Sequence, residues 1–254
     1  FNEGFRGIVI SHGTDTLAYT SAALSVILKD IPGPVVLVGS QRSSDRPSSD
    51  AKMNLMGAVR LCAKGDLSGV FVVMHGSVSD DITLIHRGTE VTKLHTSRRD
   101  AFHSVNSPPL GYIKDGKIHL EGGHERLDFE KNSFFDPNLE GNVCLIKYHP
   151  GLSPLDIDNF SRGKIGILME GTGLGHVRSE IIESLNNKIE NGIPVVVTSQ
   201  CVFGKCDLKV YSTGRRMLES KIIDSGSLTT ETTLVLMMHI LGKIQRDKEP
   251  AKIV

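Results

Sequence analysis

The sequence predicts an α/β protein of two domains: a doubly wound N-terminal domain on a parallel sheet, followed by a smaller α/β domain. Short β-branched runs alternate with helix-like stretches along most of the chain, which is the pattern of βαβ units. These runs are apolar throughout, as expected for strands that are buried on both faces of a sheet. A polar, turn-rich stretch interrupts the alternation, so we expect domains at 1–121 and 143–254 joined by a linker at 122–142.

The first domain is expected to contain strands separated by two helices. In chain order these elements are the strand 8–13, the helix 16–29, the strand 34–40, the helix 51–65 and the strand 69–76. Asp15 or Thr16 would cap the first helix, in which apolar residues recur at helical spacing. Residues 110–120 break the rhythm, because Asp115-Gly116 between two apolar runs predicts a β-hairpin.

The second domain repeats the alternation from residue 143. The expected order is the strand 143–148, the helix 154–160, the strand 164–170, the helix 178–191, the strand 194–200 and the helix 229–243. Because each helix lies between two short apolar runs, a second parallel sheet is predicted.

The charge balance limits the partners that this chain is expected to bind. Its 254 residues carry 29 Lys and Arg against 29 Asp and Glu. Proteins that bind nucleic acid over a wide surface usually have a basic excess, so the chain is not expected to be a principal nucleic-acid binder, although a local patch is compatible with the total. The pairs Arg98-Arg99 and Arg215-Arg216 are expected to be solvated or ion-paired with a neighbouring subunit rather than bound to nucleic acid.

Neither a membrane span nor a metal site is predicted. No apolar stretch approaches the roughly 18 residues that cross a bilayer, and no signal-peptide pattern opens the chain, so a cytoplasmic location is expected. The cysteines are Cys62, Cys144, Cys201 and Cys206. Because one C-x4-C lacks the paired spacing of a zinc site, we expect buried free thiols in a reducing compartment. The histidines show no metal-binding spacing.

Polar loops follow several predicted strands, at the edge where open α/β sheets bind ligands. Thr14 and Asp15 lie in one such loop, SHGTDT, and His75-Gly76-Ser77 lies in another. A threonine hydroxyl becomes nucleophilic when a base takes its proton, and a carboxylate can orient a lysine that acts as this base. Lys93, in EVTKLHTSRRDAF, is a candidate for that lysine, and an ordinary exposed lysine is the alternative.

A third loop, EGTGLGH at 170–176, is rich in glycine. It lacks the dinucleotide fingerprint and the acidic residue that should follow it. Its glycines are therefore expected to let the backbone approach a ligand or a neighbouring subunit.

Four segments occur in the order that is typical of one enzyme family: GTDT after a strand, VTK-x-H-T, FHSVNSPPLGYIKDGKI and EGTGLGH. With them the chain resembles the asparaginase and glutaminase family of threonine amidohydrolases along nearly its whole length. Within this family, LHTSRRDAF, EGTGLGH and VYSTGRR are most similar to the D-subunit branch of archaeal-type glutamyl-tRNA(Gln) amidotransferases. Members of that branch release ammonia from glutamine or asparagine, and an E subunit uses it to convert Glu-tRNA(Gln) to Gln-tRNA(Gln).

The resemblance implies roles for individual residues. Thr14 would be the second catalytic threonine, Asp15 would hold the substrate α-amino group, and Lys93 would be the base. Gly13 and Gly76 would lie where backbone N–H groups help to bind the substrate and its developing oxyanion.

The chain also departs from the family pattern. The first catalytic threonine, in a T-G-G-T segment, and the serine that holds the substrate α-carboxylate have no counterpart. Both would precede Phe1, so the chain is expected to be a fragment that is inactive on its own. Leu174 stands where free-standing asparaginases carry an asparagine, and leucine cannot make that polar contact. The resemblance therefore favours the amidotransferase subunit, and the alternatives are a stand-alone L-asparaginase and a non-catalytic assembly domain.

Partners also follow from the resemblance. The family builds each active site where the second domain of one subunit meets the first domain of another, so we expect a homodimer with Leu174 at or near the interface. An E-subunit-like partner would hold most of the tRNA and use ATP and Mg, and no cofactor is expected on this chain. Glutamine or asparagine would be the small-molecule substrate.

Overall fold

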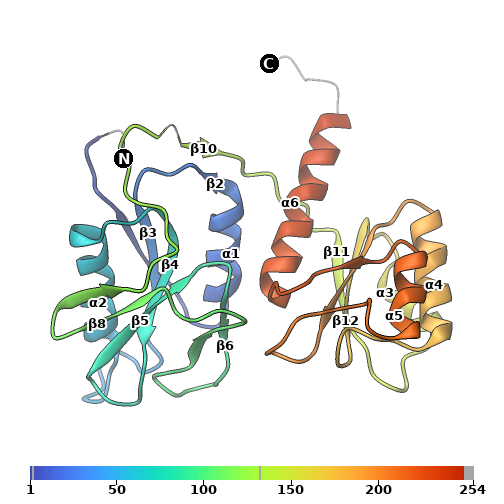
Figure 1. Cartoon of the computed structure of the whole chain (residues 1–254), viewed down its shortest axis with the longest axis horizontal. Coiled ribbons are helices and arrows are strands. Elements are labelled where there is room, and N and C mark those ends of the chain that lie inside the picture. The colour runs from blue at the N-terminus through green and yellow to red at the C-terminus, as the bar shows by residue number, and fades with distance from the viewer. Residues whose placement is uncertain (2, 132, 249–254) are drawn as a thin grey trace. The chain divides into compact units, whose positions relative to one another are not determined.

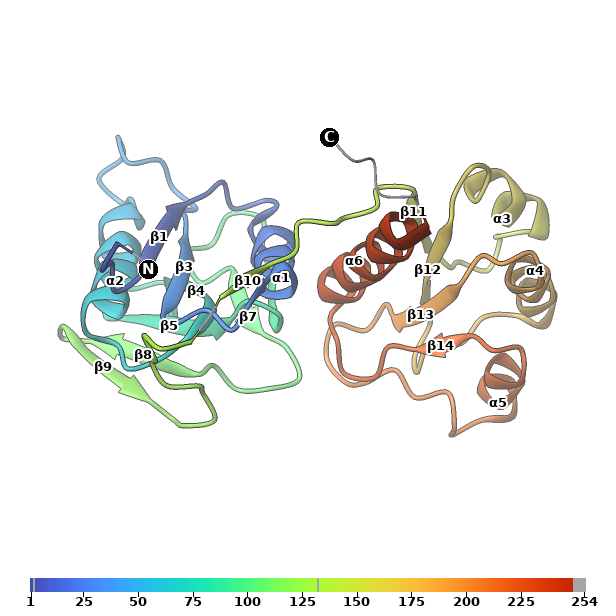
Figure 2. The same cartoon turned by 90° about the horizontal axis from the view of Figure 1, so that it is seen from above.

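The computed structural model describes residues 1, 3–131 and 133–248 and divides the chain into two units (Figures 1 and 2). The units are Phe1–Asp136 and Pro137–Val254, and each has its own sheet and hydrophobic core. Within the expected linker 122–142, β10 (Phe134–Phe135) pairs antiparallel with β2 (Leu28–Lys29). Most of this stretch is therefore part of the first unit.

A six-stranded sheet in the order β1-β3-β4-β5-β8-β9 forms the centre of the first unit. Its strands are β1 (Ile8–Ser11), β3 (Pro34–Val38), β4 (Gly69–His75), β5 (Ile82–Arg87), β8 (Gly111–Lys114) and β9 (Lys117–Leu120). The first three are parallel and confirm the predicted strands. The other three pair antiparallel, so the sheet is mixed rather than parallel throughout.

Connection lengths explain the change of direction. A parallel return needs a crossover of roughly a dozen residues or more. Between β4 and β5 the chain has only residues 76–81, so β5 runs back antiparallel. At the predicted hairpin of β8 and β9, Asp115 and Gly116 have φ values of 49° and 73°, the left-handed pair that a type I′ turn requires.

Helices α1 (Leu17–Ile27) and α2 (Ala51–Lys64) confirm two predictions and cover opposite faces of this sheet. Successive side chains of a strand point to opposite faces. On β3, Leu37 packs in the cluster that contains Leu17 of α1, whereas Val36 packs with Leu61 of α2. The predicted N-cap position is confirmed for Thr16, but the Thr16 side chain makes no capping hydrogen bond.

A small separate hairpin positions Lys93. It pairs β6 (Val91–Lys93) with β7 (Phe102–Ser104), and Lys93 lies opposite Phe102. Phe102 is buried in the same core cluster as Leu17, which anchors the hairpin on the α1 side of the sheet.

The second unit, the smaller one, is built on a four-stranded parallel sheet in the sequential order β11-β12-β13-β14. Its elements are β11 (Val143–Lys147), α3 (Pro154–Phe160), β12 (Gly166–Gly171), α4 (Ser179–Glu190), β13 (Val195–Ser199), α5 (Ser212–Glu219), β14 (Ile223–Asp224) and α6 (Thr230–Lys248). All predicted elements are present. The short α5 and β14 are additional to the prediction.

Side chains of β12 show how helices cover this second sheet. Met169 packs in one cluster with Ile181 of α4 and Met217 of α5. Its neighbour Leu168 points to the other face and packs with Met237 of α6. Right-handed crossovers that advance in one direction place α3, α4 and α5 on the same face, and α6 covers the opposite face.

The sequence predicted that the cysteines are buried free thiols. All four cysteines are free, but Cys201 is exposed, so the expectation of buried thiols is wrong for this residue. Burial raises the pKa of Cys62 to about 11 and the pKa of Cys206 to about 12.

Among the described helices, none has the length and apolar character that crossing a membrane requires.

Candidate active site

The structure brings Thr14, Asp15 and Lys93 together at the C-terminal edge of the first sheet. Lys93 Nζ lies 2.9 Å from Thr14 Oγ1 and 2.7 Å from Asp15 Oδ1, and it donates to both oxygens. Thr14 and Asp15 lie in the loop that follows β1, whereas Lys93 is the last residue of β6. The contact therefore joins this loop to the end of a strand that is distant in sequence.

Exposure and charge differ within this trio. The Lys93 side chain is 16% exposed, whereas the Asp15 side chain is 93% exposed. The hydrogen bond from Lys93 and the lysine charge hold the pKa of Asp15 below its ordinary value. Asp15 is thus an accessible carboxylate, suited to binding a cationic group, and Lys93 is a shielded amine within proton-transfer distance of a hydroxyl.

The backbone around Thr14 is held by neighbouring strands. His12 N–H donates to the Val38 carbonyl at 2.8 Å, which extends the pairing of β1 and β3 beyond the end of β1. Beside it, Gly39 leaves no room for a side chain. A Cβ there would lie 2.7 Å from His12 O and 3.0 Å from Thr14 Cγ2. Glycine at position 39 is therefore what lets the Thr14 loop pack against the end of β3.

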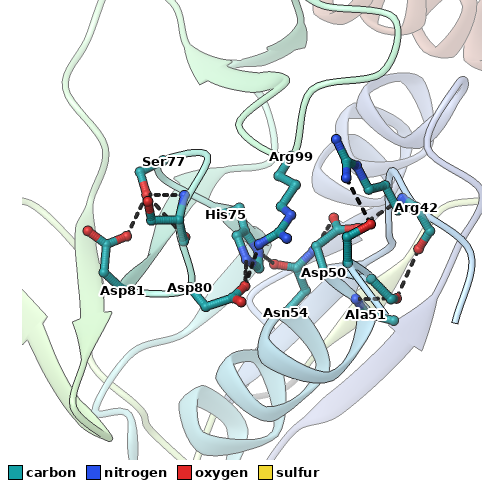
Figure 3. A network of polar contacts seen from close by, with 12 residues as sticks. Arg42, Asp50, Ala51, Asn54, His75, Ser77, Asp80, Asp81 and Arg99 are labelled. Atoms are coloured by element: carbon teal, nitrogen blue, oxygen red, sulfur yellow. Dashed lines mark hydrogen bonds and ion pairs between the residues drawn. The ribbon is translucent and has the colours of Figure 1, made fainter. Parts of the chain in front are cut away.

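A buried polar network that includes Asp50, Asn54 and His75 holds the loop that follows β3 (Figure 3). Asn54 of α2 is fully buried, and its Nδ2 donates to the Gly39 carbonyl and to Asp50 Oδ2, both at 3.0 Å. Asp50, also fully buried, accepts the N–H groups of Gln41 at 3.0 Å and Arg42 at 2.9 Å. The loop that follows β3 is thus fixed from below by two side chains.

His75 extends the network toward the loop of Lys93. Because both acceptors fix the Asn54 amide, its Oδ1 faces His75 Nδ1 at 2.5 Å, and the histidine donates. Its Nε2 lies 3.1 Å from Asp80 Oδ1, which also accepts Arg99 Nη1 at 2.6 Å. The His75 ring is thus held between the Asn54 amide and the Asp80 carboxylate.

This chain of contacts runs from Gly39, behind Thr14, to Arg99, in the loop between β6 and β7 that follows Lys93. The sequence pattern indicated the loop of His75 but did not indicate Asn54. A signal was available, because an asparagine on the otherwise apolar, core-facing side of a helix normally has a buried hydrogen-bond partner.

Gly13 and Gly76 differ in how tightly their surroundings pack against them. A Cβ on Gly13 would meet nothing within 4 Å, so this position is open. Gly76 is tightly packed, since a Cβ there would lie 2.7 Å from Leu84 Cγ, and its N–H donates to the Ile82 carbonyl at 3.0 Å. The Gly76 N–H is therefore occupied by the β4–β5 turn, and only a rearranged turn would free it for an oxyanion.

Comparisons with known proteins agree with this architecture. Residues 1–126 match the family described as Asparaginase, N-terminal, and residues 142–253 match the Glutaminase/Asparaginase C-terminal domain. The thermostable L-asparaginase from Thermococcus kodakarensis is 38% identical, has a TM-score of 0.86, and is aligned over 94% of this chain and 71% of its own.

This chain belongs to the asparaginase family.

Family members that match the chain from end to end carry a more specific name. The D subunit of the glutamyl-tRNA(Gln) amidotransferase of Pyrococcus furiosus is 48% identical over 255 residues, and its counterpart in Pyrococcus horikoshii is 46% identical. Each alignment covers 100% of this chain and 58% of the relative. The chain therefore spans somewhat more than half the length of these relatives.

The glycine-rich loop of the asparaginase C-terminal domain is folded on itself. Thr172 and His176 form an antiparallel bridge, and Gly175 has a φ of 103° with no space for a Cβ, which would lie 2.5 Å from Cys206 Sγ. Leu174 is half-buried, and its carbonyl accepts the N–H of Asp207 at 3.1 Å.

The arginine pairs singled out in the sequence are mostly paired within the chain. Arg98 pairs with Asp100 at 2.5 Å and Arg99 with Asp80 at 2.6 Å. In the C-terminal domain of this asparaginase family member, Arg216 Nη1 donates to Ser179 Oγ at 2.9 Å. The Arg98 and Arg216 side chains are also half exposed, in agreement with the solvated alternative of the prediction.

Proposed function

We propose that this chain is the ammonia-releasing amidohydrolase component of a glutamyl-tRNA(Gln) amidotransferase, acting on the side-chain amide of glutamine or asparagine. The observation that carries the proposal is the 2.9 Å contact of Lys93 Nζ with Thr14 Oγ1, in a chain whose end-to-end relatives are D subunits of this amidotransferase. Because the chain spans 58% of those relatives, the proposal concerns the activity of the whole protein.

The proposed chemistry is the addition of water across the amide C–N bond. Lys93, once neutral, takes the proton of Thr14 Oγ1, and this oxygen takes a proton in turn from the water that attacks the amide carbonyl. The water oxygen bonds to the carbonyl carbon, the C–N bond breaks, and the nitrogen receives the relayed proton from Lys93 and leaves as ammonia. The carboxylic acid that remains gives its proton to solvent and becomes a carboxylate. Asp15, with its exposed carboxylate, would hold the α-ammonium group of the amino acid.

Partner subunits would complete the reaction. An E-subunit-like protein would use the ammonia together with ATP and Mg, and would hold most of the tRNA. The equal numbers of acidic and basic residues and the internal ion pairs of Arg98 and Arg99 favour tRNA binding mainly by the partner.

We also propose a homodimer with the 170–176 loop at or near its interface. This interface should bury upwards of roughly 2,000 Å², the size of obligate interfaces.

The activity is tested by ammonia release from glutamine and from asparagine, with and without an E-type subunit and Glu-tRNA(Gln). Lys93→Arg should abolish release, because arginine stays protonated and cannot accept a proton. Lys114→Arg, at an exposed position on β8, is the matched control and should leave release unchanged. Near-normal turnover by the Lys93→Arg protein would refute the proposed base.

A stand-alone L-asparaginase is the second candidate, and the 38% identity to the Thermococcus kodakarensis L-asparaginase supports it. This candidate predicts full asparagine hydrolysis with no tRNA or partner present. The amidotransferase proposal predicts Gln-tRNA(Gln) formation when both are added.

Sedimentation of the protein at micromolar concentration tests the proposed homodimer, and a clean monomer would exclude it.

A further inference from the structure

The loop between β3 and α2 forms a polar cavity that the proposed amide chemistry does not use. It has a volume of about 600 Å³ and is lined by Gln41, Arg42, Ser43, Arg46, Ser48 and Ser97. Two guanidinium groups, three hydroxyls and one amide line this space, and no carboxylate does. The cavity is therefore rich in hydrogen-bond donors and locally basic in a chain of zero net charge.

Arg42 and Arg46 differ from other arginines near the site. Arg98 and Arg99 each pair with a carboxylate, at 2.5 and 2.6 Å. Within the described part of the chain, the guanidinium groups of Arg42 and Arg46 form no ion pair with a carboxylate, although the exposed Asp45 lies between them in sequence and the Arg42 backbone N–H donates to Asp50. Their charges are thus available to a ligand.

Internal contacts give this cavity a fixed wall. Arg42 Nη1 donates to Ser48 Oγ at 2.8 Å, and Ser49 Oγ donates to the Arg42 carbonyl at 3.0 Å. The buried Asp50 accepts the N–H groups of Gln41 and Arg42, and Figure 3 shows Asp50 beside Arg42. An arginine that is already held in place loses less conformational entropy when it binds an anion.

We propose that this cavity binds a phosphate group. Guanidinium groups bind phosphate oxygens through paired hydrogen bonds, and serine hydroxyls are common phosphate donors. An RNA backbone and a free nucleotide are the two sources of such a phosphate, since both present the same oxygens.

The site lies between two loops that border the candidate active site. Gln41 is two residues from Gly39, which packs against the Thr14 loop, and Ser97 lies in the loop that follows Lys93. A phosphate held between Arg42, Arg46 and Ser97 would therefore connect the β3–α2 loop to the loop that follows Lys93. This inference goes beyond the proposed function and does not depend on it.

Binding to the chain is measured by calorimetry at constant ionic strength with three probes: inorganic phosphate, AMP and a short RNA hairpin. The double variant Arg42→Gln/Arg46→Gln should weaken the binding of any probe that occupies the cavity roughly tenfold or more. The matched control is Arg126→Gln/Arg162→Gln, which removes the same charge at exposed positions elsewhere. It should change affinity by less than about twofold.

The probes distinguish the two sources of phosphate. If RNA is the ligand, the RNA hairpin binds more tightly than AMP. In the Arg42→Gln/Arg46→Gln variant, the slope of the logarithm of the RNA association constant against the logarithm of the salt concentration should then fall by about 2 in magnitude. If a free nucleotide is the ligand, AMP binds at least as tightly as the RNA hairpin. Ser97→Ala tests the same cavity without a charge change and should also weaken binding, and thermal melting verifies that each variant is folded.

Two results would overturn the proposal. One is that none of the three probes binds the unmodified chain at millimolar concentration. The other is that the two double variants lose affinity equally, which would show a general effect of net charge.

Discussion

The amide oxygen of Asn54 lies 2.5 Å from Nδ1 of His75, and both side chains are fully buried beneath the Thr14 loop. Neither residue touches the candidate trio of Thr14, Asp15 and Lys93 in a described hydrogen bond. Their contacts instead set the position of Gly39 on one side and of Asp80 and Arg99 on the other. The pair therefore supports the trio from behind and takes no direct part in it.

Asn54→Asp should destabilise the first unit. The substitution keeps the size of the side chain but places an oxygen where Nδ2 lies 3.0 Å from Asp50 Oδ2 and from the Gly39 carbonyl. We expect the free energy of unfolding at neutral pH to fall by about 2–4 kcal/mol. Denaturant titration measures it, and Asn159→Asp, at an exposed position of α3, is the control. If both substitutions lowered the free energy of unfolding equally, the buried network around Asn54 would not account for the loss.

His75→Phe should lower the rate of ammonia release by more than the accompanying loss of folded protein explains. A phenyl ring fills the same space but donates no hydrogen bond to Asn54 or Asp80, so Arg99 and the Lys93 loop lose a fixed neighbour. We expect ammonia release by the complete enzyme to fall roughly tenfold or more. Rescue of most of this loss by His75→Gln, which can donate to one partner, would support a positioning role. Unchanged release by the His75→Phe protein would exclude it.

Thr14→Ala should remove amide hydrolysis and leave the fold intact. The hydroxyl is lost from a position 2.9 Å from Lys93 Nζ, while the neighbouring ion pair of Lys93 with Asp15 is too exposed to contribute much to stability. The rate of ammonia release should fall by at least ~100-fold. Thr14→Ser keeps the hydroxyl and should retain a measurable rate, and equal loss in both variants would argue against a role for the oxygen.

Lys93→Met should raise the pKa of Asp15 toward the ordinary value of 3.8, because the hydrogen bond and charge that lower it are removed. The folded-state pKa of Asp15 lies below its unfolded value. The Lys93 contact therefore stabilises the fold above that unfolded value, and its contribution is lost as the pH falls through the folded pKa. Carboxyl NMR titration measures the shift. Asp156, whose pKa is lowered by hydrogen bonds from Ser153, should titrate as before.

Gly39→Ala and Gly13→Ala should differ sharply although the two glycines flank the same loop. A Cβ on Gly39 would overlap His12 O at 2.7 Å, whereas a Cβ on Gly13 has nothing within 4 Å. Gly39→Ala should lower the unfolding free energy by about 1–3 kcal/mol and displace Thr14. Gly13→Ala should be tolerated within about 0.5 kcal/mol. Thermal melting of both proteins checks this, and a tolerated Gly39→Ala would mean that the Thr14 loop moves freely.

The sequence by itself determined the local elements and the site loop that follows β1. Alternation of apolar runs with helical spacing predicted β1, β3, β4, α1 and α2, because strand and helix periodicities depend on near neighbours in the chain. It also placed Thr14 and Asp15 at a strand end, where α/β sheets bind ligands. The role of Lys93 came from the family resemblance, since nothing in its local spacing points to Thr14.

Only the tertiary structure decided which loops meet. Lys93 reaches Thr14 across 79 positions of sequence because the β6–β7 hairpin packs on the α1 side of the sheet. The antiparallel half of that sheet follows from a six-residue connection at 76–81, whose consequence appears once β4 and β5 are identified as neighbours. The pairing of Asn54 with His75, and the gathering of Arg42 and Arg46 near Ser97, likewise depend on how loops from separate strands are brought to one edge. Periodicity fixes which face a side chain takes, but strand order and connection length fix its partner.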